Sequence, residues 1–156
     1  RVLIAKAPFR EPREMQLVEH RYAGMTFFKS GGHLYTESQR ERRWTRTTLV
    51  SADGKTKIID DRSSRDRYRD PGDLVMETLP TGKNVPLQNE HWSFLRGNGA
   101  TPEGEYPFLD RVNLLTGEKT RIFQSEKGTY ESVVSVLNSD GSKLLTRRES
   151  PTEPPN

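Results

Sequence analysis

Residues 97–111 constrain this chain most, because a turn-rich polar loop there separates two apolar runs. Five residues of this loop each accept a positive φ angle or lack a backbone N–H donor: Gly97, Gly99, Pro102, Gly104 and Pro107. A helix is therefore excluded at this point. The flanking runs, 90–97 and 108–115, have the apolar density of strands buried on both faces. The pattern predicts a strand-loop-strand unit.

A short hairpin pattern occurs twice in the chain. Residues 52–59 (ADGKTKII) and 116–123 (TGEKTRIF) each combine a Gly-containing turn with a Lys-Thr-basic-Ile-apolar run, which places Lys55 and Lys119 at equivalent positions. Each copy reads as a hairpin whose last strand alternates between two faces. Repeats of short strands indicate a propeller or solenoid, although so short a match also arises by chance in β-rich chains.

The composition allows only a thin core. Of 156 residues, 31% are hydrophobic and 30% are charged, with a mean hydropathy of −0.88. Disorder fits such values, but the apolar residues are clustered in strand-length runs between turn signals, which favours a folded chain. The absence of cysteine excludes disulfides, thiolate chemistry and zinc sites with Cys ligands.

Charge and hydropathy argue against several classes of partner. No apolar run reaches the length of a membrane span and no signal-peptide pattern is visible, so we predict no membrane partner. The net charge is +3, with 25 basic residues interleaved among 22 acidic ones. The basic run around Arg40 to Arg46 is interrupted by Glu41 and carries no recognition motif, so we predict no nucleic-acid partner.

The order of strand-like runs and turns predicts an all-β fold. We expect a partial β-propeller of antiparallel four-stranded blades, with about two full blades and two half blades. The expected parts are the outer hairpin of a blade at 1–19, a blade at 23–59, a second blade at 73–124 that begins with one strand at 73–79, and the first half of a blade at 130–149. Both ends read as cut from a longer protein, and open blade edges would permit self-association.

Four stretches of the chain carry a family resemblance. They are RYAG (21–24), DRSS with DPG (61–64 and 70–72), GATPEG with PFLD (99–104 and 107–110), and LTRRESPTEPPN (145–156). Together they resemble the β-propeller of the prolyl oligopeptidase family of serine peptidases, most closely its glutamyl endopeptidase branch in bacteria and plastids. The resemblance covers nearly the whole chain.

This resemblance implies a propeller that gates or orients peptide substrate for an α/β-hydrolase domain C-terminal to this chain. That domain would carry the Ser-Asp-His triad, and this chain contains no Gly-x-Ser-x-Gly nucleophile elbow. We therefore expect no catalytic residue and no cofactor in the chain, and a peptide substrate as its partner. The alternative is a free-standing propeller or repeat scaffold for protein-protein interaction. The compartment stays open, with a bacterial periplasm or cytoplasm favoured over a plastid.

Candidate site residues follow from the order of loops. In an antiparallel meander, the loops 39–42, 97–105 and 150–156 and the connectors 60–72 and 125–129 share one rim. We expect this rim to face the substrate, and its arginines to favour acidic substrates: Arg42, Arg43, Arg62, Arg65, Arg67, Arg147 and Arg148. They could equally serve only as partners of neighbouring Asp and Glu. His20, His33 and His91 lack ligand spacing, so we predict no metal site.

Overall fold

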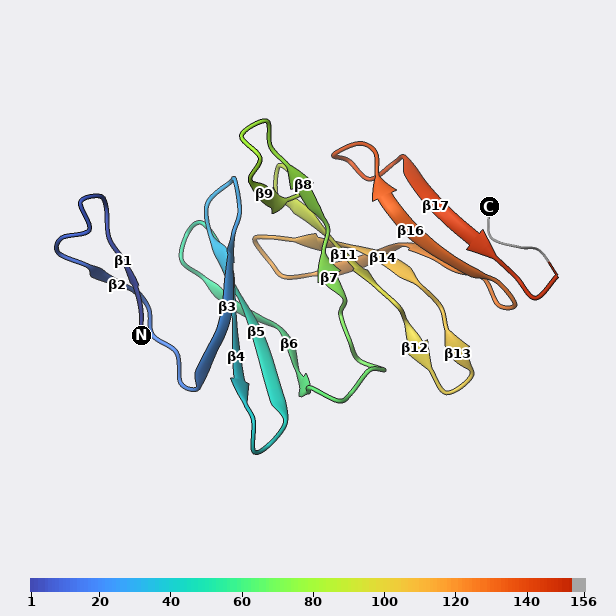
Figure 1. The fold of residues 1–156 in the computed structure, drawn as a ribbon, viewed down its shortest axis with the longest axis horizontal. Coiled ribbons are helices and arrows are strands. Elements are labelled where there is room, and N and C mark those ends of the chain that lie inside the picture. Colours follow the sequence, from blue (N-terminus) through green and yellow to red (C-terminus); the bar gives the residue numbers. More distant parts are fainter. Residues whose placement is uncertain (153–156) are drawn as a thin grey trace.

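Residues 1–152 are described by the computed structural model, and they form strands and turns only (Figure 1). Every strand pair is antiparallel, and successive sheets lie side by side along the chain (Figure 1). The predicted all-β partial propeller is confirmed. No helix among these residues could span a membrane. The last four residues of the predicted loop 150–156 lie outside the described part of the chain.

The first complete sheet has four strands in chain order: β3 (Arg21–Phe27), β4 (His33–Gln39), β5 (Trp44–Val50) and β6 (Thr56–Ser63). β4 and β5 pair without interruption from His33 opposite Val50 to Gln39 opposite Trp44. Threonines are frequent in β5, where β-branched side chains suit the pleated surface. The turn before β4 needs glycine, because Gly32 has a φ of 78° and a Cβ atom there would meet the Val50 carbonyl oxygen at 2.5 Å.

The second large sheet is built differently from the expected one. Its continuous strands are β11 (Trp92–Gly97), β14 (Phe108–Asn113) and β15 (Lys119–Gln124), and two short segments, β7 (Asp73–Leu74) and β10 (Gln88–Asn89), share the free edge of β11. The predicted single strand at 73–79 is wrong. At Val75 the chain leaves β11 and forms a separate hairpin of β8 (Met76–Thr78) and β9 (Asn84–Pro86).

Three further hairpins complete the chain. β1 (Val2–Ile4) pairs with β2 (Arg13–Gln16) at one end, and β16 (Tyr130–Val136) pairs with β17 (Leu144–Glu149) at the other. Between β11 and β14, β12 (Ala100–Thr101) and β13 (Gly104–Glu105) form a small hairpin of their own. The loop is therefore ordered by its own backbone pairing.

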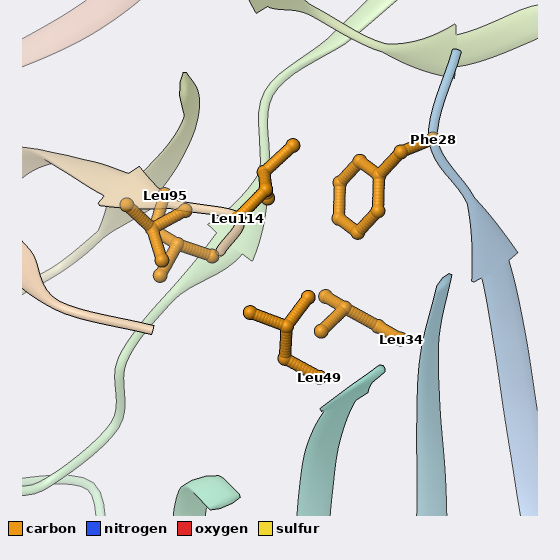
Figure 2. Packing of buried hydrophobic residues seen from close by; sticks show 6 residues of the cluster. Phe28, Leu34, Leu49, Leu95 and Leu114 are labelled. Atoms are coloured by element: carbon orange, nitrogen blue, oxygen red, sulfur yellow. The ribbon is translucent and has the colours of Figure 1, made fainter. Parts of the chain in front are cut away.

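Two apolar clusters hold neighbouring sheets together. Phe28, Leu34 and Leu49 of the first sheet pack against Leu95, Val112 and Leu114 of the second. Figure 2 shows the side chains of Phe28, Leu34, Leu49, Leu95 and Leu114 converging. The opposite face of the second sheet, with Phe94 and Leu109, packs against Val133 of β16. Adjacent strand residues point to opposite faces, so the fully buried Phe94 and Leu95 serve different clusters. The predicted burial of this strand on both faces is confirmed.

Candidate functional site

One edge of the sheets gathers the turns and connectors that carry most of the candidate residues, and we call it the rim. It contains the β4–β5 turn, the connector after β6, the β12–β13 hairpin, the turn before β16 and the residues after β17, all along the lower side of Figure 1. Side-chain and backbone contacts join neighbouring loops of this edge. Arg67 Nη2, for example, donates to Glu105 Oε1 at 2.8 Å across the first and second sheets. The rim is thus one connected surface.

The first hollow of the rim lies at the end of the first sheet and has a volume of about 840 Å³. We call it the arginine hollow, and its charged lining is Arg21, Arg40, Glu41, Arg43 and Arg65. Polar and aromatic groups complete the lining: Ser38, Gln39, Trp44, Thr45 and Ser64. Four arginines and one glutamate therefore line the same hollow.

Backbone geometry fixes the wall of the arginine hollow. Arg43 has a φ of 49°, a left-handed conformation that costs energy for a residue with a Cβ atom. Its amide closes the β4–β5 turn by donating to the Arg40 carbonyl oxygen at 3.0 Å. Its own carbonyl oxygen accepts from the amide of Ser64, so the turn and the connector are held together.

Trp44 stands between the arginine hollow and a charge network on β6. Its indole Nε1 donates to Asp61 Oδ1 at 2.6 Å, and the Arg46 guanidinium lies 4.8 Å from the centre of the ring. Arg46 also pairs with Asp61 at 2.9 Å. The indole hydrogen bond, followed by the contacts with Arg46, holds the pKa of Asp61 below its usual value. Asp61 is therefore an ionised anchor for both side chains.

A second hollow of about 600 Å³, the connector hollow, lies between the first and second sheets. Arg62 lines this hollow and contacts three aspartates. Its Nε pairs with Asp60 at 3.1 Å, its Nη2 pairs with Asp70 at 2.9 Å, and its Nη1 donates to the Asp66 carbonyl oxygen at 3.1 Å. Burial raises the pKa of Asp60 above its usual value, although Arg62 opposes the rise. Arg62 thus holds the connector in place.

The far end of the rim carries the opposite charge. A hollow of about 310 Å³, the acidic hollow, is lined by Glu103, Glu105 and Glu149 together with Tyr106 and Tyr130. No basic side chain of the described residues lines it. The charged residues that line the hollows therefore change sign from the arginine hollow to the acidic hollow, although Glu105 and Glu149 pair with Arg67 and Arg147.

The structure separates the predicted arginines into groups. Arg43 and Arg65 share the arginine hollow, whereas Arg62 and Arg67 line the connector hollow and are engaged in ion pairs. Arg42 lies on the β4–β5 turn and donates to Gln39 at 3.5 Å. Arg147 and Arg148 lie on β17, and Arg147 pairs with Glu149 at 3.5 Å, beside the acidic hollow. These seven residues do not form one site.

Two residues of the arginine hollow were missed by the sequence interpretation. Arg21 comes from the start of β3 and reaches the hollow because it pairs with Ser38 at the end of β4. Arg40 follows β4 directly, within the loop 39–42 that the sequence places on the rim. The RYAG stretch contained Arg21, so the signal was present, but its strand register was needed to place it. Among residues 1–152, no group of three or more His, Asp or Glu side chains could hold a metal ion.

Comparisons with known proteins give a consistent result. A protein named "Probable glutamyl endopeptidase, chloroplastic" from Oryza sativa subsp. japonica is 38% identical over 160 residues, and one of the same name from Arabidopsis thaliana is 35% identical over 161 residues. Each alignment covers 92% of this chain, and the chain spans 17% of the length of each relative. No family model and no solved structure matches the chain significantly. The resemblance carried by the four stretches is confirmed, and this chain is homologous to one segment of the glutamyl endopeptidases.

Proposed function

We propose that this chain is a non-catalytic propeller portion of a serine peptidase, and that its rim gates or orients peptide substrate for a hydrolase domain. The observation that supports the proposal most is the similarity to glutamyl endopeptidases over 92% of the chain. The named activity belongs to the relatives, and its transfer to the protein that contains this chain is part of the proposal.

The rim has two properties suited to guiding a peptide. Its loops are fixed to one another by hydrogen bonds and ion pairs, including Ser64 with Arg43 and Arg67 with Glu105, so they present a fixed surface. Its first hollow is also strongly basic. A concave surface lined by one sign of charge raises the local concentration of oppositely charged substrate, and the effect weakens with ionic strength. Acidic peptides are therefore the favoured substrates of this rim.

A labelling experiment in the full-length protein tests the gating role. Arg42→Cys places a thiol on the rim, whereas Lys83→Cys places one in the β8–β9 turn on the opposite edge, with the same change of charge (Figure 1). Both side chains are exposed, and this chain has no other cysteine. After attachment of a bulky maleimide, kcat/KM for a long peptide is expected to fall at least fivefold for the Arg42 variant and to stay unchanged for the Lys83 variant.

The same samples distinguish gating from general damage. A short chromogenic peptide should be hydrolysed at nearly the unlabelled rate by both labelled variants, because it passes the rim with less obstruction. Equal loss of activity in the two variants, or no loss in either, contradicts the proposed role of the rim.

A further inference from the structure

We infer that the arginine hollow binds a peptide segment carrying two or more carboxylates at a distance from the bond to be cleaved. The inference rests on the proposed function, since it names the ligand class of the same rim. It assigns the binding to Arg21, Arg40, Arg43 and Arg65, of which two were not expected from the sequence.

The four arginines of the hollow differ from neighbouring arginines in the ion pairs that they form. None of these four arginines forms an ion pair within the described residues, and all four are exposed. The neighbouring rim arginines differ: Arg46, Arg62, Arg67 and Arg69 all pair with carboxylates. Guanidinium groups form their strongest hydrogen bonds with carboxylates and phosphates. The hollow therefore gathers four guanidinium groups that form no ion pair in the described part of the chain, unlike those of Arg46, Arg62, Arg67 and Arg69.

The backbone frame of the hollow is fixed before a ligand binds. The hollow is assembled from the start of β3, the β4–β5 turn and the connector, and Ser64 ties the last two through the Arg43 carbonyl oxygen. Ser38, Gln39 and Thr45 add polar side chains around the arginines. A frame fixed before binding lowers the entropy lost when the ligand is bound. The arginines of the lining suit an anionic ligand.

The charge of the lining residues restricts the kind of anion that fits the hollow. Four arginines and one glutamate in the lining leave more positive charge than a single acidic side chain can neutralise. A nucleic acid could supply that charge, but its phosphates would continue along the rim toward the acidic hollow, whose lining among the described residues contains no basic side chain to bind them. A short acidic peptide segment can end within the arginine hollow and need not reach the acidic hollow. It is therefore the ligand that fits the lining at both ends of the rim.

Binding can be followed inside the hollow itself. The chain has two tryptophans, and Trp44 lines the hollow, so Trp92→Phe leaves one reporter of the site. In the 156-residue chain carrying this change, a peptide with four consecutive Glu residues should produce a saturable change of fluorescence. The same peptide with four Gln residues should produce none. The Kd for the Glu peptide should increase at least tenfold when salt is raised from low to high concentration.

Charge-reversal variants decide whether the named arginines are responsible. Arg40→Glu and Arg65→Glu should each raise the Kd for the Glu peptide at least tenfold. Lys127→Glu, a matched change at an exposed lysine of the same rim outside the hollow, should alter it less than twofold. Equal binding of the Glu and Gln peptides, equal effects of the three variants, or equally tight binding of a short single-stranded oligonucleotide would overturn the inference.

Steady-state kinetics of the full-length protein provide a second test that does not depend on how the 156-residue chain behaves in isolation. Arg40→Glu and Arg65→Glu should raise KM at least fivefold for a substrate with a remote acidic segment, with kcat unchanged. They should not alter KM for the Gln-substituted substrate. If KM for the acidic substrate is unchanged in both variants, the inference is overturned. If maleimide labelling of Arg42→Cys does not lower kcat/KM for the long peptide, only the gating role is overturned.

Discussion

The backbone carbonyl oxygen of Arg43 accepts two hydrogen bonds from Ser64, one from the amide at 2.6 Å and one from the hydroxyl at 3.1 Å. This contact joins the β4–β5 turn to the connector that follows β6. The amide bond lies directly beyond the Trp44–Ser63 pair, so it extends the β5–β6 pairing by one residue and holds Arg43 in its left-handed backbone conformation. The relative position of two loops of the arginine hollow therefore depends on one serine.

Removal of the Ser64 hydroxyl should loosen this junction. Ser64→Ala keeps the amide bond but loses the hydroxyl bond, with an expected loss of about 1 kcal/mol in the free energy of unfolding. Ser139→Ala, at an exposed turn on the opposite edge, should change it by no more than about 0.5 kcal/mol. Urea denaturation of the two variants checks this. Equal stabilities would show that the hydroxyl bond contributes nothing.

Glu37 should contribute more than Ser64 to the free energy of unfolding, because its side chain is only 3% exposed and accepts two backbone hydrogen bonds. Its Oε1 accepts from the Glu19 amide at 2.6 Å and from the His20 amide at 2.9 Å, which fixes the segment leading into β3. Glu37→Ala leaves both amides without a partner and should cost about 2–4 kcal/mol. Glu37→Gln keeps an acceptor and should cost about 1 kcal/mol. Glu41→Ala is the exposed control, and a cost for Glu37→Ala no greater than that of the control contradicts this role.

The fold class could be predicted from the sequence because the strand and turn signals are local. The division of residues 73–79 into β7 and β8 could not be predicted. Val75 donates to the Phe94 carbonyl oxygen and accepts from the Leu87 amide, so the chain changes strand partners at one residue. Alternation of side chains along 73–79 is the same whether the partner is β11 or β9, so local sequence carries no information about the switch. The repeated hairpins show a similar limit, since Lys55 directly precedes β6 whereas Lys119 is the first residue of β15.

The candidate site was predicted only in part, for a related reason. Arg43 and Arg65 could be placed on the rim because loop order is readable from an antiparallel meander. The engagement of Arg62 could not be read, because it depends on how the connector folds back to bring Asp60, Asp66 and Asp70 around one guanidinium group. Burial of an ion pair is a property of tertiary packing rather than of local charge pattern.

Leu49 should link the stability of the first sheet to that of the second. Its side chain is 1% exposed and lies in the cluster shared by both sheets (Figure 2). Leu49→Ala should cost about 2–5 kcal/mol through lost burial and the cavity left behind. Ile58→Ala, at a side chain that is 49% exposed, should cost less than about 1 kcal/mol.

Hydrogen exchange separates local from shared effects of the Leu49 change. Amides of β11 and β14, in the second sheet, should exchange faster in Leu49→Ala than in Ile58→Ala. Faster exchange confined to the first sheet would show that the two sheets are stabilised independently.

The outer edge of β17 should make the 156-residue chain self-associate. Among the described strands, β17 pairs only with β16, and its Leu145 side chain is 50% exposed. Unpaired strand edges pair readily with other chains, and a charge on the edge suppresses this. Light scattering should show an apparent mass that rises with concentration, and Leu145→Lys should lower it. A constant monomer mass for the unsubstituted chain would contradict the expectation.

His33 should make the protein less stable as the pH falls below neutrality. Its side chain packs beside Phe27 and Tyr35, is 7% exposed, and has no hydrogen-bond partner for Nε2 among the described residues. Burial disfavours the charged imidazolium and lowers the pKa of His33 from 6.5. The unfolded chain therefore binds more protons than the folded one below about pH 6.5, so stability is lost as the pH falls through the lowered pKa and is fully present above 6.5.

Replacement of His33 by phenylalanine should remove this dependence. Urea denaturation at pH 7.5 and pH 5.0 should show a smaller loss of stability for His33→Phe than for the unsubstituted protein. At pH 7.5 the variant should be at least as stable, because a buried nitrogen without a partner has been replaced by carbon. His91→Phe, at an exposed histidine, is the matched control and should retain the pH dependence. Parallel profiles for the two variants would show that His33 does not govern the loss of stability at low pH.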